Sequence, residues 1–126
     1  MTNKENSLNW FEISVTDIQR ATRFYEKVFR IKMEPQEMME MKMAFFPWAP
    51  GSGKATGALV HSNAHKPSAD GAKIYLNGNP DLSDALSRVE SAGGKITLPK
   101  TKIGEFGYMA FFIDSEGNSV GLHSNS

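Results

Sequence analysis

The chain has 126 residues with 14 basic and 14 acidic side chains, so its formal net charge at pH 7 is zero. A chain of this length forms one domain with a real core, and its balanced charge argues against nucleic acid or an anionic membrane as partner. The absence of cysteine excludes disulfides, thiolate chemistry and cysteine-ligated zinc.

The first seven residues are polar, and no apolar segment follows them. This pattern argues against a signal peptide, and no later stretch is apolar over the length that a bilayer requires. We therefore expect a cytoplasmic protein that does not bind membranes.

The first half of the chain reads as a strand, a helix and three strands. Alternating residues over 9–15 predict a strand whose apolar side faces the first helix. Asp17 then caps a helix that carries an apolar stripe. The predicted elements are a strand over 9–15, a helix over 17–29, strands over 31–34, 38–46 and 55–61, and a polar link over 63–71.

The second half has the same order of elements. Asp81 opens its helix, and Gly93 with Gly94 ends it. The turn over 114–118 has the Asp and Gly residues typical of a hairpin. The predicted elements are a strand over 73–77, a helix over 81–93, a strand over 95–98, a loop over 99–107, and strands over 108–113 and 119–124.

Short sequences recur between the two halves. The sequence Met-Ala-Phe-Phe at 43–46 reappears at 109–112, and Leu-Val-His-Ser-Asn at 59–63 corresponds to Gly-Leu-His-Ser-Asn at 121–125. Two copies of a strand–helix–three-strand unit explain this recurrence better than a solenoid does. We expect a single domain over 1–126 made of two pseudo-repeats, about 8–63 and 72–126.

Four of these segments carry a resemblance to a known family. Residues 10–17, Trp-Phe-Glu-Ile-Ser-Val-Thr-Asp, and 24–29, Phe-Tyr-Glu-Lys-Val-Phe, resemble the opening of vicinal oxygen chelate proteins. That superfamily includes glyoxalase I, bleomycin-resistance proteins and extradiol dioxygenases. Residues 92–95 and 114–118 resemble the second half of its glyoxalase-like members. The resemblance implies an α+β fold of two βαβββ modules, whose curved mixed sheets surround a cup, and a homodimer.

The resemblance also implies where a divalent metal would bind. Its ligand positions fall on Trp10, on Lys73 or Ile74, near Leu59, and on Gly121. Apart from a deprotonated lysine, these residues offer no metal donor. We therefore expect no metal and no other cofactor; the alternative is zinc or nickel held by a different set of residues.

Two side chains of the first strand are expected to point into the cup. Alternation places Trp10 and Glu12 opposite the apolar side of that strand. Trp10 can stack on a flat ligand or simply fill the cup. Glu12 can act as a general base, bind a ligand or pair with a neighbouring cation or tyrosine.

Four further residues are candidates for ligand binding. His61 and His123 occupy matching places in the two halves, so we expect both on the inward face, where they bind a ligand, hold a metal or transfer a proton. The alternative is that both lie at the rim, hydrogen-bonded or solvated. Tyr108 and Phe112 share one face of their strand and are candidates for the cavity wall. His65, in the link, is expected to be exposed.

Three functions fit these observations. The favoured one is metal-independent binding of a small aromatic or apolar molecule in the cup. The second is an enzyme, a lyase of the lactoylglutathione-lyase type, with zinc or nickel held by Glu12, His61 and His123. The third is a structural or regulatory subunit whose cup is filled by its own side chains.

Overall fold

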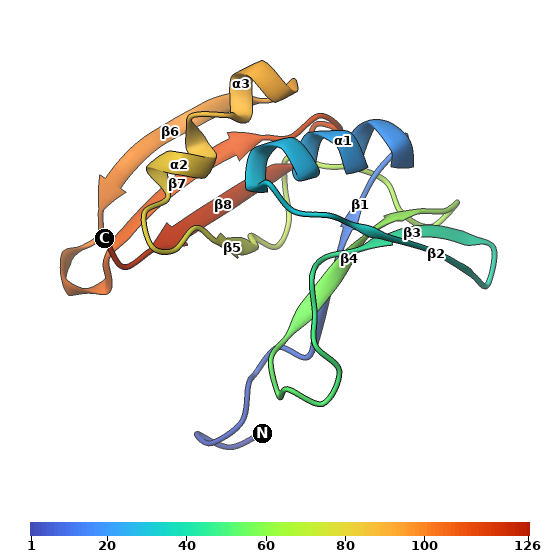
Figure 1. The fold of residues 1–126 in the computed structure, drawn as a ribbon, viewed down its shortest axis with the longest axis horizontal. Coiled ribbons are helices and arrows are strands. Elements are labelled where there is room, and N and C mark those ends of the chain that lie inside the picture. The colour runs from blue at the N-terminus through green and yellow to red at the C-terminus, as the bar shows by residue number, and fades with distance from the viewer.

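The chain forms two four-stranded sheets with the same strand order (Figure 1). The computed structural model describes residues 1–126. The first half contains β1 (Trp10–Ser14), α1 (Ile18–Phe29), β2 (Glu34–Met38), β3 (Met41–Phe45) and β4 (Thr56–His61). The second half contains β5 (Tyr75–Asn77), α2 (Ser83–Leu86), α3 (Val89–Ala92), β6 (Lys95–Lys102), η1 (Gly104–Phe106), β7 (Tyr108–Ile113) and β8 (Ser119–Ser124).

The two sheets are related by their connectivity. Their orders are β1-β4-β3-β2 and β5-β8-β7-β6. The first strand of each half pairs parallel with the last, and the other neighbours are antiparallel. The expected α+β fold of two βαβββ modules is therefore confirmed. None of the helices is both long and apolar enough to cross a bilayer.

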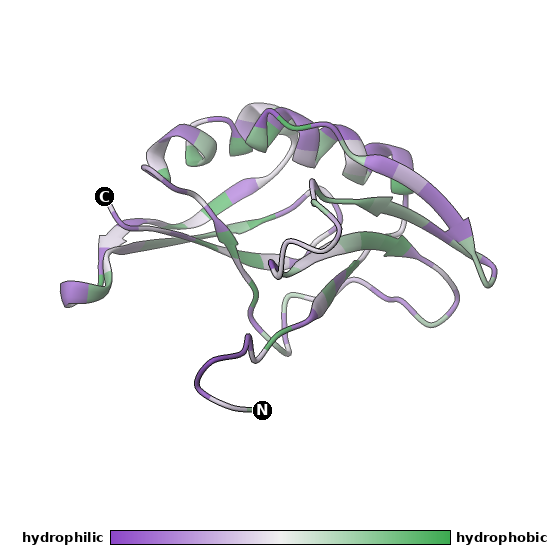
Figure 2. Cartoon of the chain, turned by 60° about the horizontal axis from the view of Figure 1, so that its bottom comes forward, coloured by the Kyte–Doolittle hydropathy of each residue, from purple (hydrophilic) through white to green (hydrophobic).

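The helices cover one face of the sheets and leave the other without a helix (Figure 2). One core of 18 buried residues fills the space between the helices and both sheets. Phe24 of α1 packs against Phe112 of β7, which joins the two modules within this core. Ile13 and Val15 belong to the same core, so the predicted apolar side of β1 does face the helix.

The turn over 114–118 connects the second module to the first. The Tyr25 hydroxyl donates to Asp114 at 2.7 Å, and the Asn118 side-chain amide donates to the Ser14 carbonyl at 2.8 Å. Burial and the adjacent Asp114 carboxylate raise the pKa of Tyr25 well above its usual range. The Glu116 carboxylate accepts the backbone N–H groups of Thr16 and Asp17 ahead of α1.

The predicted strand over 38–46 is wrong, because the chain reverses direction within it. Met38 pairs with Met41, so Met39 and Glu40 form a two-residue hairpin loop, with φ of 50° and 62°. Pro35 lies inside β2 rather than ending a strand. β2 is an edge strand, where proline's missing N–H disrupts no ladder.

The second helix is also shorter than predicted. The segment over 81–93 splits into α2 and α3 at Ser87 and Arg88. Arg88 Nε donates to the carbonyl of Val28 at 2.8 Å, so a contact with the other module holds the chain at the break. The predicted loop over 99–107 begins as strand, because β6 runs on to Lys102 through two irregularities in its pairing with β7.

Candidate functional site

The sheet face opposite the helices, here called the helix-free face, carries the expected first-strand candidates. Trp10 packs with Met43, Ala58 and Val60 in a small cluster separate from the main core. The ring of Trp10 meets Phe45 edge-on, with 5.2 Å between centroids. This placement agrees with the predicted alternation of β1; the ligand-binding role of Trp10 stays a prediction.

Glu12 lies on the same face and joins two other side chains. Its Oε2 accepts Trp10 Nε1–H at 3.2 Å, and its Oε1 lies 2.8 Å from His65 Nε2. His65 is therefore not the exposed link residue that we expected, since its side chain is only 17% exposed. The role of Glu12 as a base or ligand-binding group stays a prediction.

The two candidate histidines do not share a face. His61 follows Val60 and pairs with Lys42, so it lies on the side opposite Glu12, where its Nδ1–H donates to the Val15 carbonyl at 3.2 Å. The inward placement of His61 was wrong, because the strand register puts the inward positions one residue earlier. His123 does lie on the helix-free face, and its Nε2–H donates to the Phe106 carbonyl at 2.6 Å.

Tyr108 and Phe112 lie on the helix-covered side of β7. Phe112 is fully buried in the main core, and Tyr108 packs against that core beside the Lys100 ammonium, 4.4 Å above its ring. They do share a face with one another, as expected. Their placement on the cup wall was wrong, because alternation sends Met109 and Phe111 to the helix-free face instead.

The positions that hold a metal in the resembled family do not fit one here. No three side chains of His, Asp or Glu come together, so the alternative set of Glu12, His61 and His123 is not assembled. Gly121 pairs with Tyr75, and a Cβ atom at Gly121 would lie 2.8 Å from the Tyr75 ring. An aromatic ring therefore occupies the space of an acidic ligand, and a divalent ion needs several convergent oxygen or nitrogen donors.

An apolar cleft lies at the junction of the modules, beside the edges of β1 and β5. This junction cleft has a volume of about 490 Å³, and nine of its twelve lining residues are hydrophobic. Leu8 and Tyr75 are each about half exposed. The lining residues are Leu8, Phe11, Phe29, Ile31, Phe46, Pro47, Ala55, Thr56, Ile74, Tyr75, Leu76 and Asn77.

No charged residue lines the junction cleft. Thr56 donates its hydroxyl to the Pro47 carbonyl at 3.3 Å, and Asn77 Oδ1 accepts the Asn79 N–H at 2.9 Å. The Asn77 side-chain N–H groups donate to no acceptor within the chain. The cleft thus offers apolar walls and one free amide donor, which suits an uncharged molecule of modest size.

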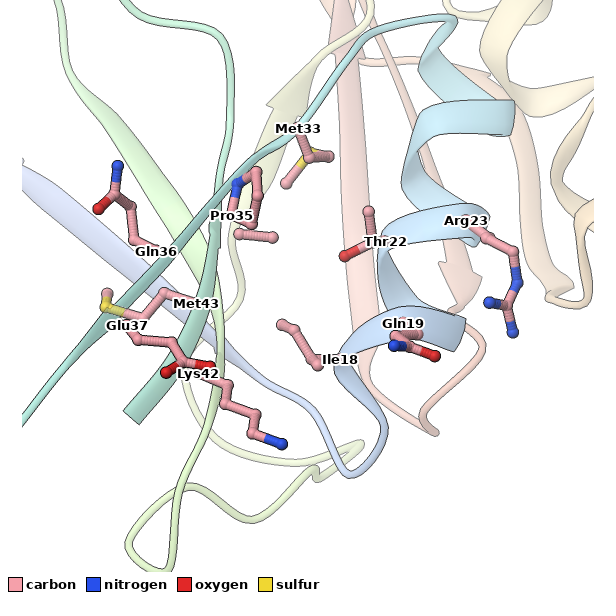
Figure 3. Close-up of a pocket in the computed structure, with 11 residues that line it drawn as sticks. Ile18, Gln19, Thr22, Arg23, Met33, Pro35, Gln36, Glu37, Lys42 and Met43 are labelled. Carbon is pink, nitrogen blue, oxygen red and sulfur yellow. The ribbon is translucent and has the colours of Figure 1, made fainter. Parts of the chain in front are cut away.

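A second hollow of about 470 Å³ lies between α1 and the β2–β3 hairpin. Figure 3 shows Ile18 and Thr22 of α1 on one side and Met33 and Pro35 on the other. Only four of its eleven lining residues are hydrophobic. With this polar lining, it is a poorer site for an apolar ligand than the junction cleft.

Sequence reasoning missed Tyr75 and the rest of the junction cleft. A signal for Tyr75 did exist, because its neighbour Ile74 was one of the two positions matched to a metal ligand. No local signal marks the cleft itself, because its walls come from segments between residues 8 and 77 that meet only in the fold.

Comparison with known proteins gives one consistent family. The family model described as "Glyoxalase/Bleomycin resistance protein/Dioxygenase superfamily" matches residues 7–122. A glyoxylase-like domain-containing protein of Didymella fabae is 31% identical over 116 residues, covering 89% of this chain and 88% of that protein. "Putative glyoxylase CFP32" of Mycobacterium tuberculosis is 25% identical over 122 residues, covering 94% of this chain. The chain spans 46% of that protein's length.

Solved structures show the same fold. Hypothetical protein SA1046 of S. aureus superposes with a TM-score of 0.66 and 21% identity over 94% of both chains. A glyoxalase I mutant of Zea mays superposes with a TM-score of 0.70 and 21% identity, over 94% of this chain and 46% of that chain. At this identity the likeness supports the fold and says nothing about activity.

Proposed function

Since the chain belongs to the glyoxalase/bleomycin resistance protein/dioxygenase superfamily, we propose that it binds a small, uncharged aromatic or apolar molecule without a metal ion. The observation that carries this proposal is the junction cleft, whose volume and apolar lining match those of small-molecule sites. Tyr75 links the cleft to the family's site, because its ring lines the cleft and also covers Gly121.

The chemistry of the cleft limits the ligand. A buried carboxylate or ammonium without a partner costs several kcal/mol, and no lining side chain carries a compensating charge. Aromatic rings gain contact area and edge-to-face geometry against Phe11, Phe46 and Tyr75. A carbonyl or ether oxygen on the ligand can accept the free Asn77 amide.

A fluorescent probe tests this proposal. N-phenyl-1-naphthylamine is uncharged and aromatic, and it brightens when it leaves water for an apolar site. We expect saturable binding that neither EDTA nor added zinc changes. Tyr75→Asp places a charge at the half-exposed mouth of the cleft and should weaken binding about tenfold or more.

Phe106→Asp is the matched control, because Phe106 is also an exposed aromatic residue but lies outside the cleft. It should leave the affinity unchanged. Equal affinity in the wild type and Tyr75→Asp, or equal weakening by both substitutions, would contradict binding in the junction cleft.

A further inference from the structure

A serine, a histidine and a glutamate form a chain of hydrogen bonds that runs from the turn after β4 to β1. Ser62 Oγ lies 2.6 Å from His65 Nδ1, and His65 Nε2 lies 2.8 Å from Glu12 Oε1. Ser62 and His65 belong to the turn after β4, whereas Glu12 belongs to β1. The side chains of His65 and Glu12 are 17% and 35% exposed, so the group lies near the surface.

The hydrogen-bond partners of His65 determine which of its ring nitrogens carries the hydrogen. A carboxylate only accepts, so His65 Nε2 carries the hydrogen that is donated to Glu12. In the neutral ring Nδ1 then has a free lone pair, which accepts the Ser62 hydroxyl. Trp10 Nε1–H donates to the other Glu12 oxygen and holds the carboxylate in place.

This order is that of an activated nucleophile: hydroxyl, base, and a carboxylate that orients the base. The ring is used in the opposite sense from the familiar serine triad, since Nδ1 rather than Nε2 faces the serine. The backbone N–H of Asn63, the residue directly after Ser62, donates to no acceptor within the chain. An N–H in that position can stabilise the oxyanion of an acyl-transfer intermediate.

We propose that Ser62, His65 and Glu12 hydrolyse small activated esters at this surface. The Ser62 oxygen attacks the ester carbonyl, and its proton passes to His65 Nδ1. The carbon–oxygen bond to the alcohol breaks, and the alcohol leaves with that proton. Water then attacks the acyl-Ser62 ester, gives one proton to His65 and releases the acid, after which the proton returns to Ser62. The net reaction is ester plus water to acid plus alcohol.

A second serine in the link provides a matched control. Ser62 Oγ accepts the Ala64 N–H at 3.1 Å, and Ser68 Oγ accepts the Asp70 N–H at 3.0 Å in a turn of the same spacing. Ser68 has no histidine partner. If the Ser62 hydroxyl only stabilised its turn, replacing Ser62 and replacing Ser68 by alanine should therefore have the same effect.

The first experiment measures covalent labelling and turnover. The wild type should be labelled at Ser62 by a fluorophosphonate probe and should hydrolyse p-nitrophenyl acetate. Ser62→Ala and His65→Gln should each lower turnover about tenfold or more, whereas Ser68→Ala should leave it unchanged. Thermal melting of each variant verifies folding, and Ser62→Ala should still bind N-phenyl-1-naphthylamine, which separates this activity from the proposed binding function.

Glu12 is a positioning residue, so its test needs a different readout. Glu12→Gln keeps an acceptor for Trp10 but removes the negative charge beside the imidazolium that forms when His65 takes the Ser62 proton, so it should lower kcat about tenfold and leave KM unchanged. The proposal is overturned if Ser62 is not labelled, if Ser62→Ala and Ser68→Ala have equal turnover, or if Glu12→Gln keeps the kcat of the wild type.

Discussion

Glu116 is the residue at which the two modules exchange the most polar contacts. Its side chain is fully buried beside an Arg20 that is half exposed, with 2.7 Å between Arg20 Nε and Glu116 Oε2. Burial by itself raises the Glu116 pKa, but hydrogen bonds from Arg20 and the Asp17 amide outweigh it, so the pKa lies below its ordinary value of 4.5. The carboxylate also lies ahead of the first turn of α1, where negative charge is favoured.

Glu116→Gln should therefore destabilise the fold by about 1–3 kcal/mol at neutral pH, because charge-assisted hydrogen bonds are lost. The lowered pKa means that this stabilisation is present above pH 4.5 and is lost as the pH falls through the folded-state value. Urea denaturation at several pH values measures it. The two proteins should converge in acid, while the exposed, unpaired Glu105→Gln control follows the wild type throughout.

Tyr75 and Gly121 should be energetically coupled. A Cβ at position 121 meets the Tyr75 ring at 2.8 Å, so Gly121→Ala should cost about 1–3 kcal/mol in the wild type. In a Tyr75→Ala background the ring is absent and the cost should fall by about 0.5 kcal/mol or more. A double-mutant cycle from chemical denaturation measures the difference. Equal costs in both backgrounds would show that the ring does not occupy this space.

At the scale of elements, the β2–β3 hairpin has an unfavourable loop. Two-residue loops with positive φ at both positions favour Asn and Gly, yet this one holds Met39 and Glu40. A left-handed conformation costs a non-glycine residue about 1–2 kcal/mol. Both residues are exposed, so no packing in the core compensates for that cost.

Glu40→Gly should raise the stability by about 1 kcal/mol, because glycine adopts φ of 62° without strain. Thermal melting provides the measurement. Glu37→Gly is the matched control, since it removes another exposed glutamate but from the extended strand β2, and it should lower the melting temperature. Equal melting temperatures of the two glycine variants would show that the loop is not strained at Glu40.

Sequence patterns predicted elements well where the local signal was strong. Alternation over 9–15 correctly separated Trp10 and Glu12 from Ile13 and Val15. The hairpin at Met39 and Glu40 contains no glycine or asparagine, so no local residue marks the reversal of the chain within 38–46. The faces of His61 and Phe112 depended on strand register, which is set by pairing with distant strands and not by local residues.

At the scale of the whole molecule, the two modules share one core although their sheets do not join. β1 and β5 are the edges of separate sheets, so no strand ladder crosses the junction. The connection comes from α1 packing on residues of both halves and from the turn over 114–118. The junction cleft exists because of this arrangement, which the sequence of either module alone does not specify.

The shared core predicts that the modules unfold together. Residues of both halves, such as Phe24 and Phe112, lie in one cluster, so opening either module exposes apolar surface of the other.

Both tryptophans belong to the first module, so their fluorescence reports on it, whereas hydrogen exchange of β8 amides reports on the second. Urea midpoints from the two measurements should coincide in the wild type. A Glu116→Gln, Asn118→Ala double variant weakens the contacts of the 114–118 turn with residues 14–20 while the apolar core is kept, so both midpoints should fall together. If the midpoints separate in that variant, the turn and not the core couples the modules. If they already separate in the wild type, the shared cluster does not make the fold cooperative.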